Sequence, residues 1–321
     1  MSSVEGVECE PPKWGTQPST VTSEVHFSSK DEKLKDQPIH KDGTDRGESY
    51  AVLTTFDFSY PDHLSPQVNE ETCKKPMVDA DGDLNVIRKN DNSKNDGVIL
   101  IEHQSSSSLE LVGEQVWRGA IFLGDFILHN PQIFKGCNVL ELASGVGMTS
   151  VVAAMMAKQV VITDVDKGDI LDMVHRNLDR NKEKIIADVK VKELDFFNLE
   201  TIEDLIEDIH KTTVSIAADV VYHNQLTDGF FNAVLRILSE PPDKTLYVAL
   251  EKRFVFTVED LETCCPMYDY FVSQLNGLWK HNQDSISWTV EQVDSESFPQ
   301  YFAHKRTKHL VLWKIQARLK I

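Results

Sequence analysis

The sequence predicts an α/β fold with a mostly parallel sheet of seven strands that is covered by helices on both faces. From residue 97 onward, short apolar segments alternate with longer segments of helical periodicity, as in folds built from strand–helix units. Several of the apolar segments end in an acidic residue, which places polar groups at the carboxyl edge of the sheet. The last two strand candidates have no clear helix between them, which is typical of an antiparallel pair at one edge.

The elements follow in a regular order along the chain. After an edge strand at 98–102, the strands of the sheet are expected at 138–142, 160–164, 189–194, 214–222, 245–251, 287–293 and 309–315. Helices are expected at 113–130, 148–158, 167–181, 202–211, 226–238 and 258–278. The first of these helices is apolar on most of its faces, so we expect it to be largely buried.

The first 96 residues form a separate region in this prediction. They are rich in Ser, Thr, Asp, Asn and Pro and bury too little surface to offset the entropy of ordering. We expect residues 1–96 to be a mostly disordered acidic arm, in which 49–59 is the one candidate for a short docked strand. Residues 97–321 are expected to form the domain.

The composition limits the possible partners and compartments. A net charge of −18 argues against direct binding to nucleic acid or to an anionic membrane and is more compatible with a basic partner protein. Five cysteines without a C-x-x-C pair indicate neither a disulfide framework nor a metal site, so we expect a reducing compartment. The polar start does not resemble a signal peptide, and no apolar run is long enough to span a membrane. We expect a monomer.

The segment 139–148 carries the strongest indication of a ligand site. An apolar strand ends at Glu141 and is followed by a turn that contains Gly145 and Gly147, where backbone can approach a ligand closely. The next strand also ends in an acid, Asp164, whose carboxylate can accept hydrogen bonds from both ribose hydroxyls of a nucleoside.

The identity of the nucleoside follows from the turn. A dinucleotide fingerprint requires a third glycine, but Ser150 stands at that position. Glu141 places a negative charge before the turn, which disfavours phosphate and suits a cation. S-adenosyl-L-methionine carries a sulfonium and an ammonium but no phosphate, so we favour it over NAD. The alternative is an ordinary tight turn without a ligand.

Two further strands end in candidate site residues. Asp195 could accept a hydrogen bond from an adenine amino group, and Phe196 could stack on the ring, although a phenylalanine there could also be core packing. After the fourth strand, Asp219 could orient an incoming amine and Tyr222 could constrain its approach; the alternative is a strand cap and a packing tyrosine. Trp117, on the first predicted helix, could cover the cofactor, with Gly119 leaving room.

These residues resemble the family 16 protein methyltransferases over about residues 98–315. The resemblance rests on Gln115-Val116-Trp117-Arg118-Gly119-Ala120, residues 141–147, Thr163-Asp164, Leu194-Asp195-Phe196 and the D-x-x-Y motif at 219–222. It implies the class I seven-stranded methyltransferase fold, which is Rossmann-like, after a disordered N-terminal arm. It also implies an enzyme of the nucleus, or of nucleus and cytoplasm, that transfers methyl from S-adenosylmethionine to lysine in a non-histone protein. Carried over by position, the cofactor contacts are Trp117, Ala143, Ser144, Gly145, Asp164, Phe196 and Ala218, and Asp219 and Tyr222 face the substrate.

The chain departs from the family pattern at two positions. Ala143 stands where a glycine is usual, so a positive φ there would cost of order 1 kcal/mol. Phe196 stands where tryptophan is usual, which removes an N–H donor. Two other classes therefore remain open: a catalytically inactive scaffold that binds chaperones or other partners, and a methyltransferase for a small molecule.

Overall fold

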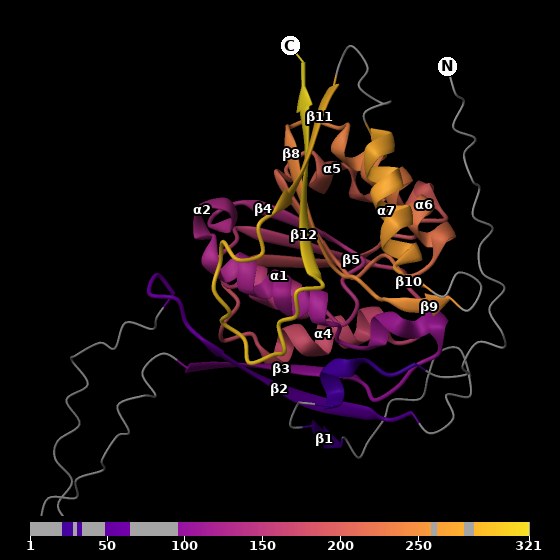
Figure 1. Ribbon diagram of the computed structural model, residues 1–321. Helices are drawn as coiled ribbons and strands as arrows, with labels where there is room; N and C mark the ends of the chain where they lie inside the picture. Colours follow the sequence, from indigo (N-terminus) through magenta and orange to yellow (C-terminus); the bar gives the residue numbers. More distant parts are fainter. Residues whose placement is uncertain are drawn as a thin grey trace, which may run out of the picture.

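The computed structural model describes residues 21–27, 31–33, 49–64, 96–257, 262–278 and 286–320. Its centre is a seven-stranded sheet, as the sequence predicted, and the strand order is β11-β12-β8-β7-β4-β5-β6 (Figure 1). The strands from β6 to β8 are parallel, whereas β12 is antiparallel to both β8 and β11. Their bounds are β4 Asn138–Leu142, β5 Gln159–Asp164, β6 Asp188–Glu193, β7 Val214–Ala218, β8 Lys244–Glu251, β11 Ile286–Val293 and β12 Leu310–Leu319.

Helices cover both faces of this sheet and define two apolar cores (Figure 1). Successive residues of a strand point to opposite faces, so Val139 joins the first core and Leu140 the second. The first core is shared with α1 Arg118–His129, α2 Pro131–Phe134, α3 Met148–Ala154 and α4 Ile170–Arg180. The second is shared with η3 Leu199–Leu205, α5 Ile206–Ile209, α6 Asn224–Leu238 and α7 Pro266–Gly277.

A second, antiparallel sheet of three strands packs against the first core. It consists of β1 Asp31–Lys33, β2 Ala51–Ser59 and β3 Asp96–Gln104, with β2 in the middle. Phe56 and Phe58 of β2 and Ile101 of β3 are buried in the core. Two asparagines, one in α4 and one directly after it, bind the free edge of β3. The side-chain amide of Asn177 pairs with the backbone of Glu102, and that of Asn181 pairs with the backbone of Leu100.

This second sheet joins residues from both sides of the predicted boundary at residue 97. The expected docked strand at 49–59 is observed as β2, and it pairs along its whole length with β3. Residues 21–27, which include η1 Glu24–Phe27, also contact the folded unit. The described parts of 1–96 therefore belong to the same folded unit as residues 97–321, while the rest of the predicted arm lies outside the described residues.

Two predicted helices begin later than expected. The helix expected at 113–130 is split: η2 Leu109–Glu114 ends before an extended segment, and α1 begins at Arg118. The helix expected at 258–278 begins at Pro266, after the hairpin of β9 Val255–Thr257 and β10 Glu262–Cys264. Proline is favoured at the first turn of a helix, which fixes this start.

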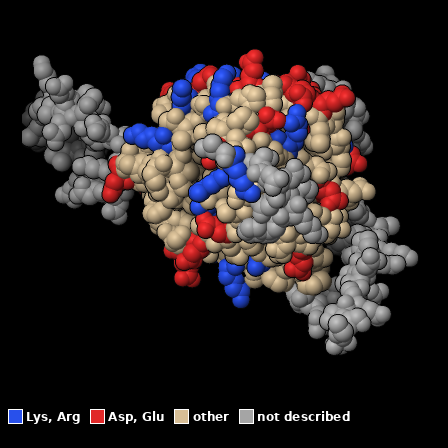
Figure 2. All heavy atoms as spheres, turned by 90° about the horizontal axis from the view of Figure 1, so that it is seen from above, with Lys and Arg blue, Asp and Glu red and all other residues tan. Residues whose placement is uncertain are grey.

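The helices and the surface charge are both relevant to what the protein could bind. In the described part of the chain, no helix combines the length and the apolar character that a membrane span needs. Figure 2 shows lysine and arginine side chains among aspartate and glutamate side chains on the face seen from above. That face therefore carries both signs of charge, despite a net charge of −18 for the sequence.

Candidate functional site

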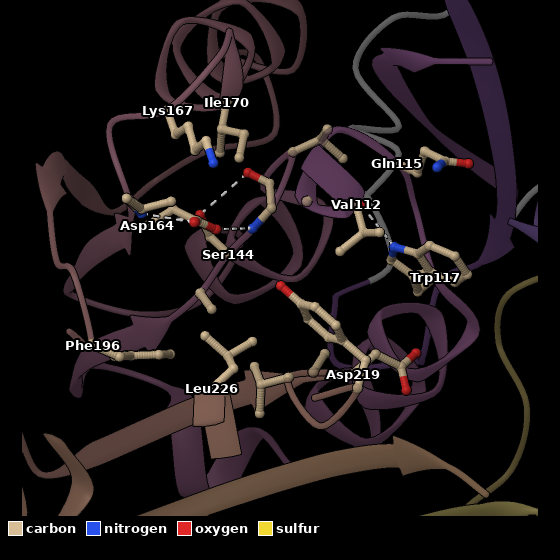
Figure 3. A pocket seen from close by; sticks show the side chains of 18 of the residues that line it. Val112, Gln115, Trp117, Ser144, Asp164, Lys167, Ile170, Phe196, Asp219 and Leu226 are labelled. Atoms are coloured by element: carbon tan, nitrogen blue, oxygen red, sulfur yellow. Dashed lines mark hydrogen bonds between the residues drawn. The ribbon is translucent and has the colours of Figure 1, made fainter. Parts of the chain in front are cut away.

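A cavity of about 610 Å³ lies where the parallel strands end. Its walls come from the chain after β4, β5, β6 and β7 and from the segment that precedes α1. In Figure 3, Asp164 and Ser144 face Gln115 and Trp117 across this space. Ten of the twelve residues predicted for the site line it: Trp117, Ala143, Ser144, Gly145, Asp164, Asp195, Phe196, Ala218, Asp219 and Tyr222.

The turn after β4 uses the left-handed backbone region repeatedly. Gly145 has φ 54° and Gly147 has φ 83°, and Ala143 also has a positive φ of 54°. The positive φ therefore costs about 1 kcal/mol or somewhat more at Ala143, where glycine would avoid it. A Cβ on Gly145 would lie 2.8 Å from the carbonyl oxygen of Gly113, so only glycine fits there.

Asp164 fastens this turn to the end of β5. One carboxylate oxygen accepts the Gly145 N–H at 2.7 Å, and the other accepts the Val165 N–H at 2.8 Å. Each oxygen keeps a further lone pair that a ribose hydroxyl could use. Burial raises the pKa of Asp164 to about 6, while the two N–H donors act in the opposite direction.

The pKa of Asp164 leads to an expected pH dependence of cofactor binding. Ribose hydroxyls donate to the ionised carboxylate, so binding favours the deprotonated form and protonation opposes it. We expect constant affinity for S-adenosylmethionine above the pKa of about 6, and a loss as pH falls through it. The limiting loss is about tenfold per pH unit.

Isothermal titration between about pH 5 and pH 8 would measure this effect. The matched variant Asp164→Asn has no titrating group and should bind weakly with no such dependence. Equal affinity of the natural chain at both ends of this range would show that Asp164 is not the acceptor.

Glu141 and Gly147 do not line the cavity. Glu141 is 1% exposed, and its carboxyl accepts a hydrogen bond from the hydroxyl of Ser150 on α3. Burial raises the pKa of Glu141 to about 8, so it is mostly neutral at pH 7. This placement differs from the prediction that Glu141 provides a negative charge to a cationic ligand, because the side chain faces Ser150 of α3 and not the cavity.

Asp195 and Phe196 follow β6 at the edge of the cavity. Asp195 accepts the N–H of Phe197 at 2.8 Å, which fixes its carboxylate at the chain reversal. Phe196 is 8% exposed and packs edge-on against Phe230 of α6, with ring centroids 5.7 Å apart. Phe196 thus belongs to the second core and also lines the cavity, so core packing is observed, while stacking on an adenine stays a prediction.

Trp117 lies outside the helix on which the sequence placed it. It is the extended N-cap residue of α1, and its indole N–H donates to the carbonyl of Val112 at 2.9 Å. The guanidinium of Arg253 lies 4.5 Å from the ring centroid, a cation–π contact. Both contacts hold the indole at the cavity wall.

The D-x-x-Y motif follows β7. Asp219 has a positive φ of 51°, and its carboxylate accepts the N–H of Gly119 at 2.7 Å and that of Glu251 at 2.9 Å. It therefore caps the start of α1 and joins it to the end of β8. Gly119 leaves room for Asp219 and not for the cofactor, because a Cβ there would lie 2.6 Å from a carboxylate oxygen. Burial raises the pKa of Tyr222 to about 12, so its hydroxyl stays protonated.

Part of the cavity wall consists of residues that were not predicted from the sequence. Lys167, after β5, forms an ion pair with Glu110 at 2.6 Å, and both residues line the cavity. Phe197 also lines it while 67% exposed, and Leu226 does so from α6. The second of two adjacent phenylalanines, Phe197, could have indicated a ligand site from the sequence. The ion pair between Glu110 and Lys167 could not have been predicted, because the two residues are far apart in the sequence.

The groups in the cavity fit S-adenosylmethionine better than a phosphate. The lining includes the acids Asp164, Asp195 and Asp219, whereas its lysine, Lys167, is already paired with Glu110. The turn at Gly145 lets the backbone approach a ligand closely. Acidic side chains that have no basic partner in the cavity favour a positively charged ligand. Among the described residues, no group of three or more His, Cys, Asp or Glu side chains could hold a metal ion.

Comparison with known proteins agrees with this site. A family model described as lysine methyltransferase matches residues 94–263. Methyltransferase-like protein 22 of Mus musculus is 41% identical over 233 residues, which are 68% of this chain and 59% of the mouse protein. The Homo sapiens protein of that name is 36% identical over 260 residues, which are 75% of this chain and 63% of the human protein. Protein-lysine N-methyltransferase EEF2KMT of Homo sapiens is 25% identical over 217 residues, which are 64% of this chain and 61% of that protein.

The chain spans less than two thirds of the length of these relatives. The family match, however, includes every residue that lines the cavity, from Leu109 to Leu226. With more than half of its length matched, the chain belongs to the lysine methyltransferase family, whose methyl donor is S-adenosylmethionine.

Proposed function

We propose that this chain is an S-adenosylmethionine-dependent protein-lysine N-methyltransferase. The observation that carries the proposal is that Asp219 and Tyr222 line the same cavity as Asp164, the predicted ribose acceptor. Substrate-facing and cofactor-facing groups thus share one space at the carboxyl edge of the sheet, where α/β folds bind cofactors. Relatives named as protein-lysine N-methyltransferases support the choice of lysine.

The residues of the motif suit a lysine amine. Each oxygen of Asp219 already accepts one backbone N–H and keeps a lone pair, so the carboxylate can attract and hold an ammonium without moving. The hydroxyl of Tyr222, neutral at a pKa of about 12, can accept an N–H without adding charge. The lysine must lose a proton before its lone pair can attack, and a held amine in line with the methyl group supplies much of the rate.

The bound cofactor supplies an electrophilic methyl group and retains the electron pair of the broken sulfur–carbon bond. The protein contributes orientation and a partly enclosed site. Trp117 forms one wall, held by Val112 and Arg253. Asp164 fixes the opposite wall.

The test is transfer of labelled methyl from S-adenosylmethionine to protein in a nuclear extract, with Asp164→Ala as the control. The proposal expects label in one or a few proteins, recovered as methyl-lysine by mass spectrometry and absent with the variant. Label on another amino acid, or on a small molecule alone, would contradict it. Cofactor binding without any transfer would favour a catalytically inactive scaffold.

We extend the proposal to a nuclear, basic protein substrate. It is supported by the net charge of −18, which favours association with positively charged partners, and by the family resemblance. Chaperone contacts are part of the same proposal. Affinity capture from separate nuclear and cytoplasmic fractions, followed by methyl-lysine analysis, tests both the compartment and the charge of the substrate.

A further inference from the structure

An N-terminal strap, residues 21–27, lies against the chain that leads into the cavity wall. Val21 pairs with Ser107, its N–H donating to the Ser107 carbonyl at 2.7 Å and its carbonyl accepting the Ser107 N–H at 2.9 Å. Val25 is 6% exposed and belongs to the first core. The strap is therefore a docked part of the fold.

Ser23 makes the central contacts of the strap. Its N–H donates to the side-chain carbonyl of Gln115 at 2.7 Å, and its hydroxyl donates to the backbone carbonyl of Val116 at 2.5 Å. Ser23 is 1% exposed, so both bonds are shielded from water. Gln115 and Val116 line the cavity, and Trp117 follows them directly.

The Gln115 side-chain amide makes three hydrogen bonds in this arrangement. Its nitrogen donates to the carbonyl of Val21 at 3.0 Å and to the hydroxyl of Ser107 at 2.6 Å, while its oxygen accepts from Ser23. Figure 3 shows Gln115 beside Trp117 at the wall opposite Asp164. Gln115 therefore ties the cavity wall to the strap through both of its N–H donors and its carbonyl oxygen.

A second connection runs from the strap to the D-x-x-Y motif. Glu24 forms an ion pair with Arg118, the first residue of α1, and Arg118 also binds Glu251 at 2.6 Å. The N–H of Glu251 donates to Asp219. Glu24 is 64% exposed, so this ion pair is weak by itself; the buried contacts of Ser23 dominate.

We propose that Ser23 is a positioning residue that couples docking of the strap to binding of S-adenosylmethionine. The backbone at 115–117 lies between η2 and α1, where the Gln115 N–H donates to the Val112 carbonyl at 3.2 Å, Val116 is buried in the first core and Trp117 contacts Val112 and Arg253. The strap adds the bonds of Ser23 to Gln115 and Val116. If the strap is released, residues 115–117 become more mobile, so the protein loses more conformational entropy when it binds S-adenosylmethionine. Coupling is reciprocal, so the cofactor must tighten the strap by the same factor. The proposal rests on cofactor binding at this site and not on the identity of the methylated substrate.

The experiment compares Ser23→Glu with Thr22→Glu in the full chain. A buried glutamate cannot occupy the Ser23 position, whereas the neighbouring Thr22 is exposed and accepts the same charge at the surface. Isothermal titration is expected to give a dissociation constant roughly 5- to 100-fold higher for Ser23→Glu and unchanged for Thr22→Glu. The melting temperature without cofactor identifies any variant that is unfolded at the titration temperature.

Hydrogen exchange in the natural chain provides a measurement that needs no variant. S-adenosylmethionine should slow exchange of the amides at 21–25, which a strap with only a structural role would not show. Unchanged exchange there, or equal affinity of the two folded variants, would overturn the coupling. A natural chain that binds no S-adenosylmethionine would overturn the cofactor site itself, whereas binding without lysine methylation would contradict the proposed function alone.

Discussion

Replacement of Gly119 with alanine is expected to lower the rate of methyl transfer by about 10²-fold. The new Cβ would lie 2.6 Å from one carboxylate oxygen of Asp219 and 2.7 Å from its Cγ, which is closer than real contacts allow. Alanine favours a helix by about 1 kcal/mol over glycine, but this gain does not remove the clash. The carboxylate must move away from the N–H groups of Gly119 and Glu251, and with it the group that would hold the amine.

Gly277→Ala is the matched control for this experiment. Gly277 is the last residue of α7, and a Cβ there meets nothing within 4 Å. Single-turnover rates at saturating cofactor should fall for Gly119→Ala and remain unchanged for Gly277→Ala. Affinity for S-adenosylmethionine should change far less than the rate. An unaltered rate in Gly119→Ala would show that the position of Asp219 is not important for transfer.

Truncation to residues 97–321, the predicted domain, is expected to prevent stable folding. It removes β2, with buried Phe56 and Phe58, and leaves Ile99 and Ile101 of β3 uncovered. Each fully buried phenylalanine contributes about 2–3 kcal/mol, and β2 adds a complete ladder of hydrogen bonds to β3. The sum is a large part of the roughly 5–15 kcal/mol by which domains are stable.

A fragment of residues 21–321 is the control, because it keeps all described segments of the N-terminal region. Thermal unfolding followed by circular dichroism should show one cooperative transition for this fragment. The fragment of residues 97–321 should show no cooperative transition, or aggregate. A cooperative transition in the shorter fragment, near the temperature of the longer one, would show that β2 is dispensable.

The sheet and its strand ends could be predicted because they depend on local patterns. Residues 138–142 and 160–164 are short apolar runs that end in acids, and both are strands at the expected positions. The same pattern located Asp164 and Asp195 at one edge. The left-handed conformation at Ala143 falls at a position that usually belongs to glycine, where the sequence could give the cost of a positive φ but not the φ itself.

The first helix shows where local patterns fail. Val116 and Trp117 continue the apolar character of α1, so periodicity extended the helix over them. Their extended backbone is fixed by contacts with the distant Ser23 and with Val112, which no local pattern reveals. The role of Gly119 was misassigned for a similar reason, since its neighbour Asp219 is 100 residues away in the sequence.

Glu141 illustrates a different limit. Its position before the turn indicated a charge near the cofactor, but sequence does not show which way a side chain points at a strand end. The structure turns it toward Ser150, where burial keeps it mostly neutral. The acids that line the cavity without a lysine partner are therefore Asp164, Asp195 and Asp219, whereas Glu110 is paired with Lys167.

The position of β12 between β8 and β11 has a consequence for the order in which the chain assembles. The strand Leu310–Leu319 pairs with both neighbours, although it is made after them. Until it emerges from the ribosome, β8 has one unpaired edge and β11 has no partner in this sheet. Unpaired strand edges readily join other chains, so the nascent protein is most exposed to aggregation just before β12 is synthesised.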